Sequence, residues 1–135
     1  GDDVLLGYGG NDIITGGSGQ DDLYGGAGQD SFVFNSTNDS PNYGSAYNDV
    51  IWDFQKGQDR LDVSAIDANT GIADDQSFVF TGAYAGGAFV DPGEIYTYQR
   101  NGYTEVYLNT TGGDAAEAMF KLYGNFTLTS ADFVL

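Results

Sequence analysis

Aspartate recurs at intervals of nine residues over the first thirty positions of this chain. Asp3, Asp12, Asp21 and Asp30 each lie two residues after a glycine that keeps the same phase. Calcium binds about six to eight oxygen ligands and accepts carboxylates together with backbone carbonyls. One Asp in each glycine-rich turn can therefore supply negative charge while the peptide carbonyls of the turn supply the other ligands. The spacing predicts a row of cation sites.

Glycine must shape these turns, because a turn that points carbonyls inward needs backbone angles that glycine adopts freely. The clearest copies are GGSGQDDLY (16–24) and GGAGQDSFV (25–33), after a looser copy, GYGGNDIIT, in which Tyr8 replaces the second glycine. Clusters of Gly and Asp usually indicate loops, but loops do not keep a nine-residue phase. An apolar residue in each copy is expected to start a short strand with an inward side chain, at Leu5, Ile14, Leu23 and Phe32.

These copies match the nonapeptide GGxGxDxUx, and the segment resembles the repeats-in-toxin (RTX) family of secreted bacterial proteins. The resemblance implies a parallel β-roll in which two nonapeptides make one coil, so that Asp3 faces Asp21 and Asp12 faces Asp30, with calcium between them. The nine-residue phase also reaches Asp39, which would close a third site below Asp21. The ligands implied are the acids named above and the carbonyls of Gly7, Gly9, Gly10, Gly16, Gly17, Ser18, Gly19, Gly25, Gly26, Ala27 and Gly28.

After Phe34 the repeats give way to a polar loop and then to ordinary strand patterns. Asn101-Gly102 is a preferred pair for a two-residue hairpin turn. Few segments favour a helix, so the predicted fold is all-β: a calcium-binding parallel β-roll over 1–34 that continues into a β-sandwich-like cap and secretion module over 35–135. Strands are expected at 50–54, 60–64, 77–81, 94–100, 103–109 and 116–124, with a last strand near Phe133.

The segment NDVIWDFQKGQDRLDVSAIDA (48–68) resembles the module that follows the repeats in serralysin-type proteases and in alginate epimerase modules. The resemblance implies that this module caps the roll and holds a further calcium ion. Of the acids Asp49, Asp53, Asp59 and Asp62, we predict only Asp59 as a ligand, because an acid on the outer face of a strand is normally solvated. The predicted apolar plug of the roll consists of Trp52, Phe54, Phe78 and Phe80.

Composition excludes several classes of function. The chain has 20 acidic and 4 basic residues, a net charge of −16, so it should repel nucleic acids and anionic membranes and attract cations. It has no His and no Cys, which excludes a His-dependent triad, a cysteine nucleophile and an HExxH zinc site. Catalysis by a pair of carboxylates, as in glycoside hydrolysis, remains formally possible, but we predict a module without catalytic activity. The acids in question are Glu94, Glu105 and Glu117.

The predicted function is calcium-triggered folding and type I secretion of a larger extracellular protein from a Gram-negative bacterium. The chain begins inside a repeat, without a signal segment or a membrane span, and is expected to be a fragment that does not insert into membranes. Extracellular calcium sites bind at about 10⁻⁴–10⁻³ M, so the turns should stay open inside the cell. The end of the chain resembles the signal that the exporter reads in serralysin-like proteins, and it consists of Asp132, Phe133, Val134 and Leu135.

A polysaccharide-binding accessory module of a carbohydrate-active enzyme, such as an alginate epimerase, is the alternative. Four tyrosines of one predicted hairpin, Tyr96, Tyr98, Tyr103 and Tyr107, could stack on sugar rings. Tyrosines in strands more often serve packing, however. A chain with so few cations is also poorly suited to a polyanion such as alginate.

Overall fold

The structure, a computed structural model, describes residues 1–43, 47–84, 91–113 and 115–135. These residues form short strands and one 3₁₀ helix, and none of them lies in an α-helix. Within the described part of the chain, no helix is long and apolar enough to cross a bilayer. The elements are β1 (Val4–Leu6), β2 (Ile13–Ile14), β3 (Asp22–Tyr24), β4 (Ser31–Val33), β5 (Val50–Ile51), β6 (Arg60–Asp62), β7 (Val79–Ala83), β8 (Glu94–Arg100), β9 (Tyr103–Asn109), β10 (Ala118–Tyr123), η1 (Ser130–Asp132) and β11 (Phe133–Val134).

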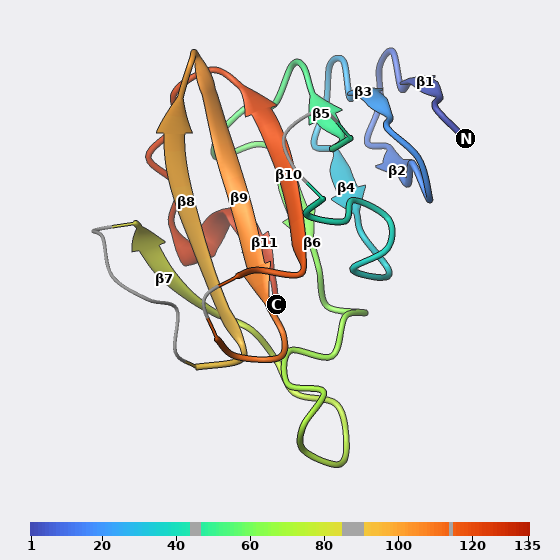
Figure 1. The fold of residues 1–135 in the computed structure, drawn as a ribbon. Coiled ribbons are helices and arrows are strands. Elements are labelled where there is room, and N and C mark those ends of the chain that lie inside the picture. The colour runs from blue at the N-terminus through green and yellow to red at the C-terminus, as the bar shows by residue number, and fades with distance from the viewer. Residues whose placement is uncertain (44–46, 85–90, 114) are drawn as a thin grey trace.

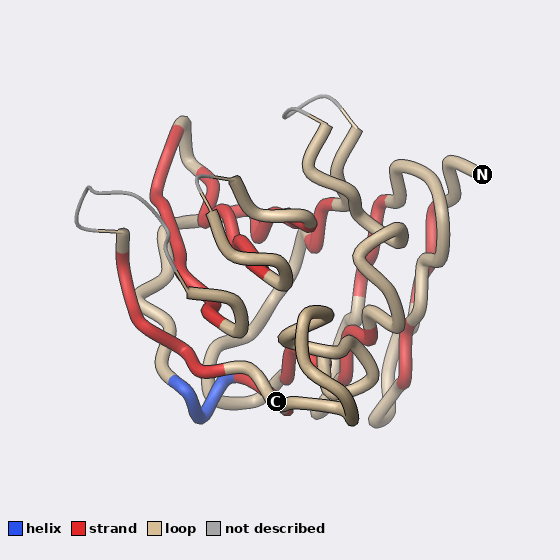
Figure 2. The backbone as a smooth tube through the Cα atoms, turned by 60° about the horizontal axis from the view of Figure 1, so that its bottom comes forward, coloured by secondary structure: helices blue, strands red, loops and turns tan. Residues whose placement is uncertain are grey.

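The described strands form two sheets. The larger has the order β1-β3-β5-β10-β9-β8-β7, and the smaller has the order β11-β6-β4-β2. In each coil the chain passes from one sheet to the other, and successive coils pair in parallel. Figure 1 shows these coils stacked at one side of the molecule, beside the long strands β8, β9 and β10. The tube in Figure 2 shows that turns make up much of each coil. The strands β1 to β6 therefore form a parallel β-roll.

One apolar side chain per strand fills the interior of the roll. Leu5 pairs with Leu23 and Leu23 with Ile51 in the larger sheet. In the smaller sheet, Ile14, Phe32, Leu61 and Phe133 are in register. Leu23, Ile51, Phe32 and Leu61 are fully buried. The apolar position of each nonapeptide thus recurs at the same height in every coil, as its phase predicts.

Both sheets of the roll continue past residue 34. β5 pairs with β3 and β6 with β4, although these later strands lie outside the nonapeptide repeats. β10 then adds to β5 and β11 to β6, again in parallel. The cap therefore extends the hydrogen-bond ladders of the roll. Its strands also cover the apolar edge of the last coil.

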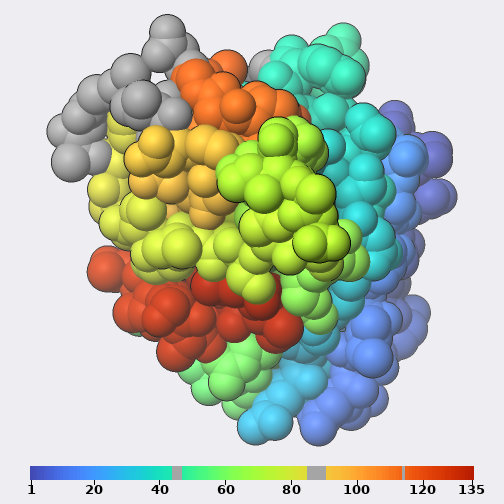
Figure 3. All heavy atoms as spheres, turned by 90° about the horizontal axis from the view of Figure 1, so that it is seen from below, coloured from blue at the N-terminus to red at the C-terminus, as the bar shows by residue number. Residues whose placement is uncertain are grey.

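The last residues of the chain are part of this structure. Val63 donates its N–H to the carbonyl of Val134 at 3.0 Å, and the side chain of Phe133 is only 7% exposed. The Phe133 ring lies 5.0 Å from that of Phe80, centroid to centroid. Figure 3 shows the red C-terminal segment packed against the yellow segment that contains β7. The tail is thus the final strand of the smaller sheet.

The hairpin of β8 and β9 has the predicted bounds, 94–100 and 103–109. Asn101 and Gly102 have φ angles of 54° and 83°, and two positive values are what a type I′ turn requires. The strands predicted at 50–54 and 60–64 are shorter than expected, because the chain turns away after Ile51 and after Asp62. The strand predicted at 77–81 lies two residues later, as β7.

Three of the four residues predicted to plug the roll do lie in the core. Phe54 and Phe78 are buried, and Phe80 packs against the same core. The prediction for Trp52 is wrong, because neighbouring strand residues point to opposite faces and Ile51 takes the inward position. Trp52 lies on the outer face, where its ring stacks on Tyr24 and its Nε1–H donates to Asp22 at 2.7 Å.

Candidate metal centre

Aspartates lie above one another along one side of the roll. Asp3 donates its backbone N–H to Oδ1 of Asp21 at 2.8 Å, and Asp21 donates its own N–H to Oδ1 of Asp49 at 2.9 Å. The strands that follow these residues pair in register, Val4 with Asp22 and Asp22 with Val50. The three acids therefore form one column, at the point where each coil enters the larger sheet.

A second column lies where each coil enters the smaller sheet. Asp12 donates its N–H to Oδ1 of Asp30 at 2.9 Å, and Asp30 donates its N–H to Oδ1 of Asp59 at 3.1 Å. Asp59 is thus in the position below Asp30. Its other carboxylate oxygen accepts the N–H of Gln55 at 2.8 Å.

Four carboxylate oxygens of the columns are buried without a partner. Oδ2 is buried without a hydrogen bond in four of these acids: Asp12, Asp21, Asp30 and Asp49. The whole residue is at most 1% exposed in Asp21, Asp30 and Asp49. A buried carboxylate oxygen without a donor or a cation is strongly disfavoured, because it has lost its hydration. These four atoms are the most direct indication of a cation in the described structure.

The unpartnered oxygens point back into their own turns. Oδ2 of Asp21 lies against Gly16, and Oδ2 of Asp30 lies against Gly25, so close that a Cβ on either glycine would overlap it. Gly28, at φ 143°, has the same restriction, since its Cβ would overlap the carbonyl of Gly10 in the turn above. Each turn therefore holds a carboxylate oxygen inside a cradle of backbone, and glycine keeps that cradle open.

The predicted carbonyl residues come together in stacked turns. Gly9 pairs with Ala27 in a parallel bridge. Ala27 donates its N–H to the carbonyl of Tyr8 at 3.0 Å, and Gly10 donates to the carbonyl of Ala27 at 2.8 Å. The turn that contains Gly7, Gly9 and Gly10 thus lies on the turn that contains Gly25, Gly26, Ala27 and Gly28. The turn of Gly16, Gly17, Ser18 and Gly19 lies beside the start of the chain, where the amino group of Gly1 donates to the carbonyl of Ser18 at 2.7 Å.

Tyr8 adopts the backbone conformation of the glycine that it replaces. Its φ angle is 69°, against 82° at Gly17 and 89° at Gly26 in the corresponding positions. A residue with a Cβ is strained there by about 1–2 kcal/mol. The geometry of the first turn is therefore retained at a cost in stability.

Asp39 does not occupy the position predicted for it below Asp21, because Asp49 does. Asp39 instead accepts the N–H of Asn35 at 2.8 Å with Oδ2, within its own loop. The loop after Phe34 breaks the nine-residue phase, so counting by nines selects the wrong acid. A local signal remains at Asp49, where an apolar residue follows two positions later, at Ile51, as Leu23 follows Asp21.

Two further acids of the cap hold the backbone of neighbouring turns. Asp53 accepts the N–H groups of Gly25 and Gly26, one with each carboxylate oxygen, both at 2.8 Å. Asp62 accepts the N–H and the hydroxyl of Ser64. The carboxylate of Asp53 thus supplies hydrogen-bond acceptors where the stack of glycine turns ends. The strand pattern of the sequence did not predict this role.

Burial dominates the electrostatics of the columns. It raises the pKa of Asp49 to about 7, with added repulsion from Asp21 and Asp39, although the hydrogen bond from Asp21 acts in the opposite direction. Burial likewise raises the pKa of Asp59, and the charges of Asp30 and Asp53 contribute. A cation in each column would offset the penalty of the buried carboxylate there.

The donor set fits a hard cation. Among the described residues, no three acidic, His or Cys side chains cluster closely enough to hold a metal ion by themselves. Carbonyls would therefore supply most ligands, with few carboxylates, and calcium accepts such a mixture in flexible geometry. The columns and cradles offer oxygen only, which disfavours softer transition metals. We conclude that the residues fit calcium, while each predicted ligand stays a prediction.

Two of the three acids considered for catalysis, Glu105 and Glu117, are engaged in hydrogen bonds. Glu105 accepts the hydroxyl of Tyr107 at 2.8 Å. Glu117 accepts the N–H of Thr110 at 2.7 Å and the hydroxyl of Thr111. Although burial acts against ionisation, these hydrogen bonds lower the pKa of Glu117. Both acids stabilise their surroundings as hydrogen-bond acceptors.

Comparison with known proteins agrees with this architecture. The family model described as "Peptidase M10 serralysin C terminal" matches residues 3–135. The chain belongs to this family. It is also similar to two solved structures from the Azotobacter vinelandii mannuronan C5-epimerase. The AlgE6R2 subunit is 28% identical, with a TM-score of 0.63, and the match covers 98% of this chain and 75% of that one.

The AlgE6R3 subunit is 24% identical with a TM-score of 0.59, and this match covers 98% of the present chain and 77% of the other. Both neighbours are β-roll repeat modules, so the serralysin C-terminal chain described here shares their all-β roll. None of the curated proteins matches it.

Proposed function

We propose that this chain is a calcium-binding module whose roll folds when calcium is bound, and that it belongs to a larger secreted bacterial protein. The observation that carries the proposal is the unpartnered Oδ2 atom in each of Asp21, Asp30 and Asp49. Each atom lies buried in one of the two aspartate columns, in a chain of net charge −16. Calcium would pair these oxygens and screen the columns.

Binding energy then becomes folding energy, because the unfolded chain has no preformed site. The chain has no Cys, so no disulfide can hold the roll instead. Sites of the extracellular class bind calcium at about 10⁻⁴–10⁻³ M. The turns would stay open in the cytoplasm and close outside the cell, and the module itself would be without catalytic activity.

Export through a type I system is the second part of the proposal. The terminal residues Asp132, Phe133, Val134 and Leu135 would be the signal that the exporter reads. Burial of Phe133 in the folded module supports an order of events in which the exporter meets this tail before calcium folds the chain.

Circular dichroism with and without calcium tests the folding proposal. Chelator should remove most of the β signal and the near-ultraviolet signal, and millimolar calcium should restore both. Magnesium at the same concentration should fail, because it requires a tighter octahedron of ligands. A chain that keeps its near-ultraviolet signal and melting temperature in chelator would refute the proposal.

A second candidate function is an accessory module that binds polysaccharide. Its support is the 28% identity to a subunit of a mannuronan C5-epimerase and a groove lined by tyrosines on the cap. Binding of the whole chain to a panel of polysaccharides in calcium tests this candidate independently of the folding experiment.

A further inference from the structure

A groove of about 380 Å³ lies on the outer face of the larger sheet, over β8 and β9. Ile95 and Val106 of these strands point inward to the core, so the alternate residues point outward. The volume falls in the usual range of small-ligand sites, about 300–1,000 Å³. The lining residues are Asn42, Tyr84, Tyr96, Tyr98, Arg100, Tyr107, Ala115 and Ala116.

Paired tyrosines form the floor of the groove. Tyr96 and Tyr107 are directly opposite in the antiparallel ladder, and their rings are parallel within 3°, with centroids 4.8 Å apart. Tyr84 and Tyr98 stand around them, with ring centroids 6.2 Å apart at an interplanar angle of 66°. The side chain of Tyr98 is 40% exposed. The groove thus offers a partly exposed tyrosine ring beside two rings that stack on each other.

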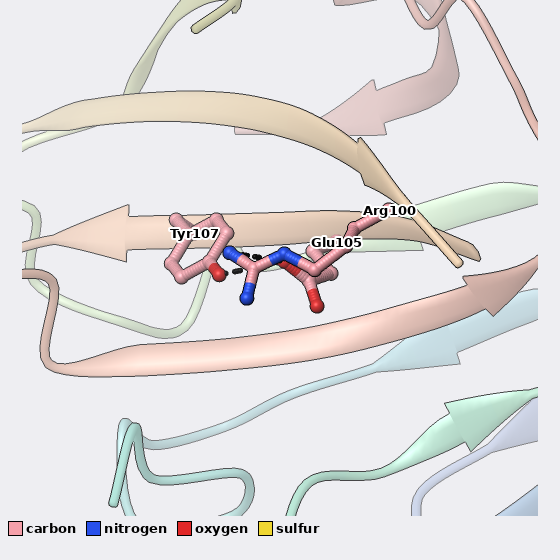
Figure 4. Close-up of polar contacts among 3 residues, drawn as sticks. All are labelled: Arg100, Glu105 and Tyr107. Carbon is pink, nitrogen blue, oxygen red and sulfur yellow. Dashed lines mark hydrogen bonds and ion pairs between the residues drawn. The ribbon is translucent and has the colours of Figure 1, made fainter. Parts of the chain in front are cut away.

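The charged groups at the groove are paired with each other. Arg100 lies over the ring of Tyr98, with Cζ 5.1 Å from the centroid. Its guanidinium is 3.6 Å from Glu105, which also accepts the Tyr107 hydroxyl at 2.8 Å, as Figure 4 shows. Burial raises the pKa of Tyr107, so this hydroxyl keeps its proton. Glu105 is only 4% exposed. The charge of Arg100 is therefore balanced by Glu105, and the N–H donors of its planar guanidinium are held in place.

This combination selects an uncharged ligand with both an apolar face and hydroxyl groups. Aromatic rings bind apolar surface with defined geometry, and Arg and Tyr groups supply hydrogen bonds around them. A polyanion would meet a chain of net charge −16 and a cation that is already paired. We propose that the groove binds a pyranose ring of a neutral oligosaccharide, stacked on Tyr98 and held by hydrogen bonds from Arg100.

The inference deepens the second candidate function, because it names the ligand and the site. It needs calcium only to keep the chain folded and not as an ion bound in the groove. The experiment uses the whole chain in calcium. Calorimetric titration with three uncharged probes, cellohexaose, laminarihexaose and maltohexaose, should show binding of at least one. A mannuronate hexamer serves as the anionic comparison and should bind more weakly or not at all.

Variants assign the binding to the groove. Tyr98→Ala should lower the affinity for the best probe about tenfold, through loss of the stacked ring, whereas Tyr98→Phe keeps the ring and should stay within about threefold. Tyr123→Ala is the matched control, because Tyr123 is 54% exposed on the same face but does not line the groove. It should leave the affinity unchanged.

Chemical-shift mapping on the unaltered chain keeps the test valid even if a variant folds poorly. The bound probe should shift Tyr98, Arg100 and Tyr107. The inference would be overturned if none of the neutral probes bound at about 10-fold molar excess over about 1 mM protein. These concentrations would reveal even a millimolar dissociation constant. Tighter binding of the mannuronate hexamer would overturn it as well. Shifts centred on Tyr24, Trp52 and Tyr123 would overturn the groove while leaving the accessory-module function standing.

Discussion

Asp49 accepts the backbone N–H of Asp21 at 2.9 Å, although 28 residues separate them in the chain. The distance in sequence is not a multiple of nine, because the polar loop after Phe34 lies between them. The relationship nevertheless reproduces that of Asp21 to Asp3, which are 18 residues apart. The loop after Phe34 is therefore inserted without breaking the column, because Asp49 returns to it.

Neutralising Asp49 should therefore weaken calcium binding. Asp49→Asn keeps the shape and the acceptor for Asp21, but it removes the charge of the buried Oδ2 atom. We expect a loss of calcium affinity of about tenfold or more, since affinity in such sites follows ligand charge. Calorimetric calcium titration measures it.

The matched control is Asp39→Asn, which alters the acid that the nine-residue phase selects. Asp39 accepts a hydrogen bond from Asn35 within its loop and acts on Asp49 only through charge repulsion, so its replacement should change the affinity by less than about threefold. If the losses for the two variants were reversed, Asp39 and not Asp49 would be the ligand.

In chelator, the stability of the chain should fall as the pH rises from about 4 to about 7. Burial raises the pKa of Asp49 from 3.8 to about 7, so the folded state holds a proton that the unfolded state releases earlier. Below about pH 4 both states are protonated and nothing is lost. Above about pH 7 the loss is complete, on the order of 4 kcal/mol at most.

Near-ultraviolet circular dichroism in chelator between about pH 4.5 and 7.5 checks this window, because the chain that chelator unfolds at neutral pH should regain folded signal on acidification. Asp49→Asn should flatten the dependence, though not remove it, because burial raises the pKa of Asp59 as well. Stability of the metal-free wild type that increased over the same range would contradict the buried, unpaired state of these carboxylates.

Replacing Tyr8 with glycine should stabilise the first turn. Tyr8 is 78% exposed and has a φ angle of 69°, so the substitution relieves backbone strain and removes little packing. The extra freedom of glycine in the unfolded chain offsets part of the gain, and we expect about 1 kcal/mol. Denaturant unfolding in calcium measures it.

Gly17→Ala provides the reverse control, because Gly17 has the corresponding positive φ and a Cβ added there would meet no other atom within 4 Å. Strain alone should then destabilise the roll by about 1 kcal/mol. A destabilising Tyr8→Gly substitution would mean that the exposed ring contributes more than the strain costs.

The periodic part of the fold could be predicted because each inference depended on local phase. The phase of Asp12 and Asp30 fixed their column, and Asn101-Gly102 fixed the hairpin to the residue. The pairing of β11 with β6 could not be predicted, because it joins residues about 70 positions apart with no repeat to set the register. Asp53 was missed for a related reason: its partners are amides of Gly25 and Gly26, which no side-chain pattern reveals.

The last strand should be necessary for the stability of the folded module as well as for export. Phe133 is buried against Phe80 in the core, whereas Val134 is 41% exposed. Phe133→Ala should therefore cost about 3–5 kcal/mol and lower the melting temperature in calcium by roughly 6–20 °C. Val134→Ala, one residue away on the outer face, should cost less than about 1 kcal/mol. Thermal unfolding of the two variants in calcium gives the comparison, and secretion of the parent protein is measured separately. A Phe133→Ala variant that kept the wild-type melting temperature would contradict the burial of this side chain against Phe80 in the folded module.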